Sequence, residues 1–169
     1  MILYGTAHQI GAGITTAQII APAQRGDGDP AWLAAHCLAS VDPALAERVA
    51  EGDLLVAAQD FGAGEDAEIA VLALQALGFA AIICGSCAPG LREAADTYGL
   101  PVLIAPDAAV ALAGGQVVRV DLAGGSLTDR TSGARFSFTP AAPALIAAVR
   151  RAALLRRMRG VVEQEGFDG

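Results

Sequence analysis

Short apolar segments that alternate with an amphipathic helix constrain the fold of this chain more than any other feature. Residues 54–58, 80–84 and 102–104 are apolar runs of strand length, and residues 69–77 carry apolar side chains at helical spacing before Gly78 ends the helix. Each apolar face of such a sheet needs a partner layer, which the helices supply. The sequence therefore predicts an α/β fold with helices packed on a sheet.

The N-terminal part predicts three further elements. Residues 2–4 form a first strand, and Asp29 caps a helix that begins at Pro30 and reaches about Leu38. A second short helix begins at residues 42–43 and ends before Gly52.

The C-terminal part has a different pattern. Apolar and polar side chains alternate in three segments separated by glycine turns, residues 116–121, 126–128 and 135–138. This pattern predicts antiparallel hairpins. Residues 143–164 predict a helix with an arginine face, which we interpret as solvent-exposed, with a docking surface for an acidic partner as the alternative. The arginine face consists of Arg150, Arg151, Arg156, Arg157 and Arg159. The opposite side of the helix carries Leu145, Val149, Ala152, Leu155 and Val162. Without a repeat or linker, residues 1–169 predict a single domain.

Composition argues against several classes of protein. The chain is 169 residues long and 54% hydrophobic, but it contains no uninterrupted apolar run of the roughly 18 residues that a membrane span requires. A net charge of −7 argues against nucleic-acid binding, which needs a basic face. Three cysteines make no disulfide framework, and the first residues lack the pattern of a signal peptide, so we expect a cytoplasmic protein.

The strand at 54–58 runs into a glycine turn and then into an acidic helix start. Gly62 and Gly64 let the backbone turn sharply, and Glu65, Asp66 and Glu68 crowd the first helical turn. Carboxylates at this position suit the helix dipole and can cap free N–H groups. The same carboxylates can provide a general base and a neighbour that sets its pKa. Both interpretations, capping and catalysis, stay open on residue types alone.

Several short motifs follow one another in a fixed order and spacing. They are residues 36–38 (His-Cys-Leu), 41–43 (Val-Asp-Pro), 52–53 (Gly-Asp), 60–64 (Asp-Phe-Gly-Ala-Gly), 73–74 (Ala-Leu), 78–79 (Gly-Phe), 81–82 (Ala-Ile), 86–88 (Ser-Cys-Ala) and 99–101 (Gly-Leu-Pro). Together they resemble the small subunit of 3-isopropylmalate dehydratase, also called isopropylmalate isomerase, and the swivelling domain of aconitase. The resemblance covers nearly the whole chain and implies a swivelling β/β/α domain, with a C-terminal helix following.

The chain departs from the family pattern where substrate is bound. In the family, the glycine turn is followed by Ser-Ser-Arg, which the resemblance implies supplies a serine base and an arginine for a substrate carboxylate. Here these positions are Glu65, Asp66 and Ala67. In the stretch after the next strand, Glu93 stands where the family has a second substrate-binding arginine, and Arg92 lies one place earlier. An early aspartate-rich segment of the family is also absent.

These positions define the candidate site. The predicted catalytic residues are Glu65, Asp66 and His8, the last placed in an early loop, and the predicted substrate-binding residues are Gly62, Gly64, Glu68, Ser86, Cys87, Arg92 and Glu93. Carboxylates that replace cations repel a di- or tricarboxylate substrate. The Coulomb energy of two unit charges a few ångströms apart is on the order of several kcal/mol at a protein surface. We therefore expect a non-standard substrate.

Cysteine and histidine positions predict neither a metal nor an iron–sulfur cluster in this chain. Cys37, Cys84 and Cys87 lack the spacing of cluster ligands, and His8 and His36 are too far apart in sequence for a metal signature. In the family, the 4Fe-4S cluster belongs to a separate large subunit or domain. Cys84 and Cys87 form a C-x-x-C motif, for which a structural role is favoured over a redox pair.

Two functions from different classes follow. The first is a diverged hydro-lyase or isomerase component, working with a large cluster-bearing subunit or alone, on a small-molecule substrate. The second is a catalytically silent binding or assembly module on the same scaffold. Homo-oligomers are the other partner expected, and neither nucleic acid nor membrane is.

Overall fold

The computed structural model describes the backbone of residues 1–167 and the side chains of residues 1–158. Its elements follow in the order β1 (Ile2–Gln9), α1 (Thr16–Ile19), η1 (Pro22–Gln24), α2 (Pro30–His36), α3 (Leu45–Arg48), β2 (Leu54–Val56), α4 (Ala67–Leu77), β3 (Ala81–Cys84), α5 (Pro89–Tyr98), β4 (Val102–Ile104), α6 (Pro106–Ala111), β5 (Val117–Asp121), β6 (Ser126–Asp129), β7 (Arg135–Ser137) and α7 (Pro143–Phe167). The predicted α/β alternation, the hairpins and the C-terminal helix are all present.

One seven-stranded sheet, in the order β4-β3-β2-β1-β5-β6-β7, organises the molecule. β1 to β4 are parallel neighbours, and β5 to β7 continue the sheet in antiparallel pairing from the other edge of β1. Parallel strands need crossover helices, whereas antiparallel strands can be joined by short turns. The change in sequence pattern after residue 115 therefore marks the change from parallel to antiparallel pairing.

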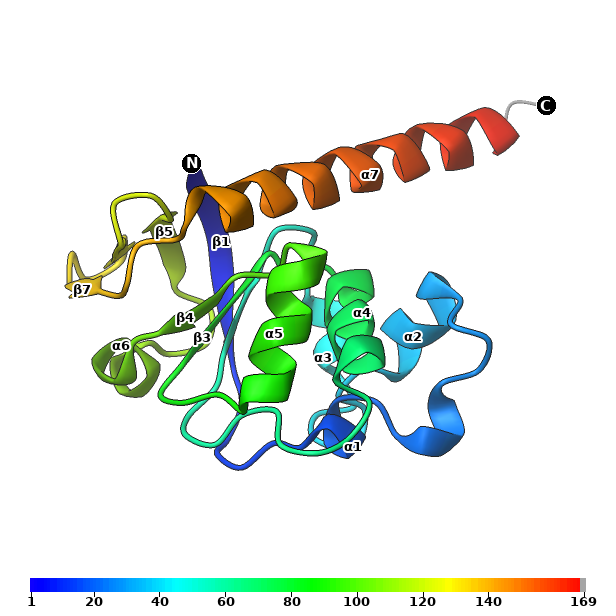
Figure 1. Ribbon diagram of the computed structural model, residues 1–169, viewed down its shortest axis with the longest axis horizontal. Coiled ribbons are helices and arrows are strands. Elements are labelled where there is room, and N and C mark those ends of the chain that lie inside the picture. The colour runs from blue at the N-terminus through cyan, green and yellow to red at the C-terminus, as the bar shows by residue number, and fades with distance from the viewer. Residues whose placement is uncertain (168–169) are drawn as a thin grey trace.

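Each face of the sheet has its own apolar core. On β2, Leu55 belongs to the cluster beneath α1, α2, α4 and α5, whereas Leu54 and Val56 belong to the cluster that includes α6, the hairpins and the start of α7. Alternate side chains of a strand point to opposite faces, so three apolar residues in succession are buried from both sides. Figure 1 shows α4 and α5 side by side on one face, with α6 away from them.

β1 is longer than the sequence predicted. The strand continues through Gly5, Thr6 and Ala7 to Gln9, so His8 lies within a strand and the prediction of an early loop around it is wrong. The polar residues Thr6 and His8 obscured the strand pattern. Their register partners on either side, Val117 on β5 and Leu55 on β2, supply the pairing that makes this segment extended.

α5 follows the C-x-x-C motif, where the βαβ alternation allows a helix, and the structure adds α6, which the sequence pattern did not predict. Both begin at a proline that follows a strand, at Pro89 and Pro106, which is a favoured first helical position. α6 has only six residues, too few for an apolar periodicity to be recognised. Among the described residues, no helix combines the length and the apolar character needed to cross a membrane.

α7 runs across one end of the molecule, and its C-terminal turns extend beyond α4 and α5 (Figure 1). Among its described side chains, Ala148 and Val149 near its start are buried, whereas Leu155 is 56% exposed. Leu155, predicted on the side opposite the arginines, is therefore mostly exposed to solvent. Arg156 forms a 3.1 Å ion pair with Glu51, so the arginine face is not uniformly solvated. The predicted side-chain positions of Arg159 and Val162 lie outside the described residues.

Candidate active site

The glycine turn and the loop after β3 meet at the carboxyl edge of the parallel strands. Phe61 and Cys87 form a parallel β-bridge, and the amide of Asp60 donates a 2.8 Å hydrogen bond to Ser86 Oγ. The amide of Phe61 donates to the Ser86 carbonyl, and the amide of Ala88 donates to the Phe61 carbonyl. Ligands of open α/β sheets bind at this edge, because the loops there are free to carry polar groups. The fold thus places the predicted turn where a site belongs.

Two glycines of the turn are required by its geometry. Gly62 and Gly64 have φ values of 85° and 128°, which residues with a Cβ adopt rarely. A Cβ at Gly62 would collide with Leu91 of α5, and a Cβ at Gly64 would collide with the hydroxyl of Thr16 in α1. These two glycines therefore form the turn and let α1 and α5 close on it.

Asp66 connects the glycine turn to α4. It precedes the helix with a left-handed backbone, φ 58°, and its side chain makes no capping hydrogen bond. Instead, a carboxylate oxygen, Oδ2, accepts a 2.6 Å hydrogen bond from Arg25 in an ion pair. Sequence reasoning missed Arg25, because the loop that carries it is 41 residues away. No local pattern signals such a contact.

A cleft of about 750 Å³ opens beside this ion pair, between the loop at residues 25–28, the start of α4 and one side of α5. Its charged lining consists of Arg25, Asp27, Asp66, Glu68 and Glu93. Three predicted site residues, Asp66, Glu68 and Glu93, are therefore brought together. Four carboxylates face one guanidinium, so the cleft favours neutral or cationic groups over a further carboxylate.

Glu65 is exposed and does not line this cleft. Its neighbour Asp66 occupies the rim with the arginine, so the two adjacent acids have different surroundings. Their assignment as catalytic residues stays a prediction; Asp66 lines the cleft, although its side chain is 53% exposed.

Arg92 and Glu93 lie on different sides of α5. Glu93 lines the cleft, whereas the positive charge of Arg92 lowers the pKa of Cys87. Successive residues of an α-helix are about 100° apart around its axis, since one turn takes 3.6 residues. Arg92 therefore does not take the place of an arginine one position later.

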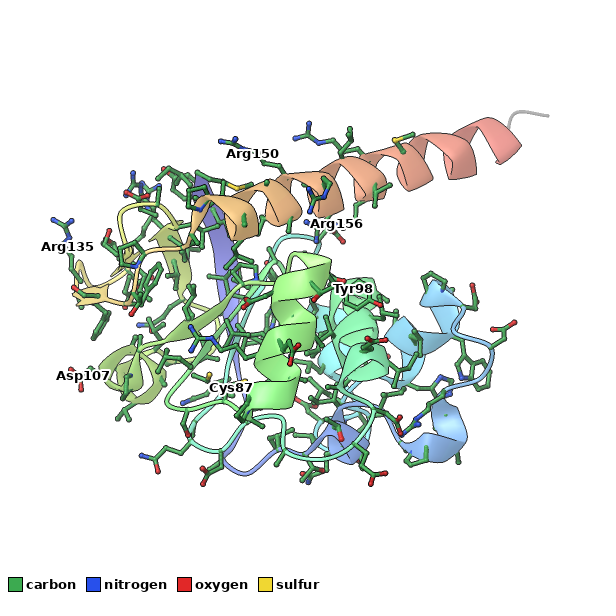
Figure 2. The ribbon with its side chains drawn as sticks, in the orientation of Figure 1. Cys87, Tyr98, Asp107, Arg135, Arg150 and Arg156 are labelled. Carbon is green, nitrogen blue, oxygen red and sulfur yellow. The ribbon has the colours of Figure 1, made fainter. Side chains whose placement is uncertain are left out.

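Cys87 and Cys84 form a second polar group next to the turn. A hydrogen bond from Cys84 lowers the pKa of Cys87, and Arg92 lowers it further, while burial of the thiol opposes both. That same hydrogen bond and burial raise the pKa of Cys84. Cys87 is half-buried at the foot of α5 (Figure 2). Cys87 is thus the more acidic of the two thiols.

His8 is not brought to the glycine turn. Its Nε2 lies 2.7 Å from Oδ2 of Asp53, and the Asp53 carboxylate also accepts hydrogen bonds from the amides of Thr6 and Ala50. Asp53 immediately precedes β2, whereas the turn follows that strand. Both side chains of the pair are about one-tenth exposed. No local sequence pattern signals this long-range pair, and a catalytic role for His8 stays a prediction.

The absence of an iron–sulfur cluster, whose ligands are thiolates, from this chain stays a prediction. Burial raises the pKa of Cys37 well above its ordinary value, and the pKa of Cys84 is raised as well. Within the described part of the chain, no three side chains of the His, Cys, Asp and Glu types gather to hold a metal ion.

Known proteins share both the sequence pattern and the fold. No family model matches the chain. The 3-isopropylmalate dehydratase small subunit of Moorella thermoacetica is 35% identical over 143 residues, which are 85% of this chain and 86% of that one. The 2,3-dimethylmalate dehydratase small subunit of Eubacterium barkeri is 34% identical over 132 residues, which are 78% of this chain and 81% of the relative.

A solved structure agrees over the full length. The crystal structure of 3-isopropylmalate dehydratase from Methanocaldococcus jannaschii matches with a TM-score of 0.82 and 27% identity, and the match covers 100% of both chains. The predicted resemblance and the predicted fold class are confirmed. With this fold and with the identity to dehydratase small subunits over most of its length, the chain belongs to the 3-isopropylmalate dehydratase small-subunit family.

Proposed function

We propose that this chain is the small subunit of a two-component hydro-lyase, which acts with a large subunit on a hydroxy acid through the turn at residues 60–67. Relatives of 34–35% identity are named as small subunits of dehydratases for 3-isopropylmalate and 2,3-dimethylmalate. The geometry of the turn supports a role in the same class of reaction. A cluster, where one is used, belongs to the large subunit in this proposal.

The acidic lining of the cleft carries the finer part of the proposal. Asp27, Asp66, Glu68 and Glu93 face one guanidinium, that of Arg25. A second substrate carboxylate placed there would meet like charges at close range. The preferred substrate therefore presents a neutral or cationic group to this cleft, where the substrates named for the relatives are dicarboxylates.

Asp66 is the proposed base. Elimination of water from a hydroxy acid takes a proton from the carbon beside the carboxyl group, and a base within hydrogen-bond reach must accept it. The Asp66 carboxylate stands at the rim of the cleft, held by Arg25 at 2.6 Å in one orientation. Arg25 acts as a positioning residue, because it fixes the carboxylate that receives the proton.

A catalytically silent assembly module is the second candidate. Ala67 stands where the resemblance implies an arginine, so the chain has lost a cation that a dicarboxylate site needs. In this alternative, the scaffold is retained for its contacts with the large subunit alone.

Turnover by the complex separates the two candidates. The chain is co-purified with its large subunit and assayed for alkene formation from 3-isopropylmalate and from a monoamide of the same acid. We expect the monoamide to be the better substrate, and Asp66→Asn to lower kcat by about 100-fold or more, the usual contribution of a general base. Glu65→Gln in parallel assigns the base between the two adjacent acids.

Asp107→Asn provides the control, because Asp107 is exposed on α6, away from the cleft (Figure 2). A preference of the native complex for the dicarboxylate, or a preference for the monoamide that Glu68→Gln and Glu93→Gln leave unchanged, contradicts the proposed substrate class. Full activity in both Asp66→Asn and Glu65→Gln removes the acidic turn from the chemistry. A complex that forms but turns over neither compound supports the assembly module.

A further inference from the structure

A second cavity, of about 420 Å³, lies where α7 crosses the ends of α4 and α5 (Figure 1). Four helices contribute to its wall, with Leu33 on α2, Leu72 on α4, Tyr98 at the end of α5 and Leu155 on α7. Ligand pockets of proteins measure about 300–1,000 Å³ and often lie between packed helices. The cavity is therefore large enough to hold a small molecule.

Hydrocarbon makes up most of this wall. Leu33 is buried, Ala76 and Ala152 are half-buried, and Leu155 keeps 56% of its surface exposed. The amide of Gln75 is already engaged, because its Nε2 donates a 2.7 Å hydrogen bond to the carbonyl of Tyr98. An occupant with a hydrocarbon part would remove apolar surface from water, which is favourable.

The charged lining of the cavity consists of two arginines of α7, Arg151 and Arg156. The sequence pattern places both opposite Leu155, but the structure brings all three side chains to this cavity. Glu51 holds Arg156 in the 3.1 Å ion pair, whereas Arg151 has no ion-pair partner among the described residues. Two guanidinium groups and one carboxylate leave one positive charge at the edge of the cavity, which suits a single anionic group.

We propose that this cavity binds an amphipathic monocarboxylate, whose carboxylate pairs with Arg151 and whose hydrocarbon chain lies among Leu33, Leu72 and Leu155. A guanidinium matches a carboxylate with two parallel N–H···O hydrogen bonds, which gives arginine its preference for this group. Burial of the hydrocarbon chain supplies most of the affinity, and the unpaired arginine selects the charge of the headgroup.

The cavity differs in charge from the cleft beside Asp66. The two share Gly28, Leu72 and Thr97 at their boundary, but four carboxylates line the cleft and arginines line the cavity. A monocarboxylate is therefore repelled by the cleft and attracted by the cavity. Binding in the cavity is independent of the proposed hydro-lyase reaction.

Octanoate and three matched probes test the site on the full-length chain. Methyl NMR spectra of leucine-labelled protein follow each titration, and we expect octanoate to shift the signals of Leu33, Leu72 and Leu155. Octanamide, the neutral isostere, should bind about two- to fivefold more weakly, the usual worth of an ion pair at an exposed arginine. Heptylammonium, with the same hydrocarbon chain and the opposite charge, should bind more weakly still. Hexanoate should bind on the order of tenfold more weakly than octanoate, since it buries two methylene groups fewer.

Matched substitutions locate the two parts of the ligand. Arg151→Gln, at an exposed position, should weaken octanoate to the level of octanamide. Arg150→Gln should leave the affinity unchanged, because Arg150 lies outside the lining and Figure 2 shows it on the side of α7 away from α4 and α5. Ala152→Leu fills the cavity with hydrocarbon and should weaken octanoate about tenfold or more. Ala147→Leu, exposed and outside the lining, should have no effect.

Any of three results would overturn the proposal: no saturable shift with octanoate, equal affinities for octanoate and octanamide, or an affinity that neither Ala152→Leu nor Ala76→Leu lowers. Circular dichroism verifies that each variant is folded, and Ala76→Leu fills the cavity from α4 should Ala152→Leu displace α7. A second copy of the chain is the competing occupant. A dimer in sedimentation that Leu155→Ala dissociates and octanoate does not would assign the cavity to that copy and likewise overturn the proposal.

Discussion

At the scale of single residues, Asp66 shows how the structure changes the meaning of a sequence position. The sequence places an acid at a helix start, which is consistent with capping or with catalysis. In the structure its backbone is left-handed, a conformation that Asp and Asn tolerate better than most residues, and its carboxylate pairs with Arg25 rather than with the helix. The acid is therefore held outward at the rim of the cleft.

Gly64 offers a residue-scale prediction on the same turn. Gly64→Ala must place a Cβ at φ 128° and against the Thr16 hydroxyl, and Thr16 is buried. We expect the free energy of unfolding to fall by about 1–3 kcal/mol, the usual cost of such a strained conformation. Urea unfolding followed by circular dichroism measures it.

Gly90→Ala is the matched control, because no heavy atom lies within 4 Å of the position of its Cβ and Gly90 is in the first turn of α5. This substitution should be neutral or stabilising by up to about 1 kcal/mol. Equal effects at the two glycines would show that the turn does not need its left-handed backbone.

At the scale of elements, the buried side chains of α7, among those that the structure describes, lie near its start. Val149 is 3% exposed, and Ala148 contacts the end of α5 at Gly99, whose Cβ would collide with the Ala148 carbonyl. Farther along, Leu154, Leu155 and Met158 are each more than half exposed, and a cavity of about 420 Å³ lies between α7 and the other helices. The amphipathic pattern of the sequence predicts a helix correctly but does not tell where its apolar face finds a partner.

Two truncations on α7 should separate its packed and exposed parts. Val149→Ala should lower the free energy of unfolding by about 1–3 kcal/mol, since it removes buried methyl groups and leaves a cavity. Leu154→Ala, at 57% exposure, should change it by less than about 0.5 kcal/mol. Thermal unfolding of both variants at one concentration checks this. A larger loss at Leu154 would mean that its side chain is covered in solution.

At the scale of the whole molecule, β1 joins the two halves of the sheet. It pairs in parallel with β2 and antiparallel with β5. Ala7 of β1 belongs to one apolar core, and the ring of His8 lies edge-on to Phe79 of the other, with centroids 6.1 Å apart. Asp53 ties β1 to the strand beside it through His8 and the amide of Thr6. Because both cores share this strand, neither half keeps its packing without the other, and we expect cooperative unfolding.

Asp53→Ala tests this. Loss of the carboxylate leaves the buried His8 and two amides without their acceptor, which should cost about 3–5 kcal/mol. Far-ultraviolet circular dichroism and the fluorescence of Trp32, the single tryptophan, should shift by the same amount in denaturant. Two separate transitions would contradict the shared-strand account. Asp107→Asn, at an exposed position, should stay within about 0.5 kcal/mol of the native protein.

Local apolar spacing and motif order were enough to predict the α/β alternation, the glycine turn, the antiparallel C-terminal part and the family. The packing of the elements was needed to reveal two long-range ion pairs, Arg25 with Asp66 and His8 with Asp53. It was also needed to show that Glu93 on α5 lines the cleft. Short-range patterns record which side chains share a strand or helix face. Contacts between residues far apart in the chain depend on how the elements pack, and for that reason the charge of the cleft became apparent only when the loop carrying Arg25 was placed against α4.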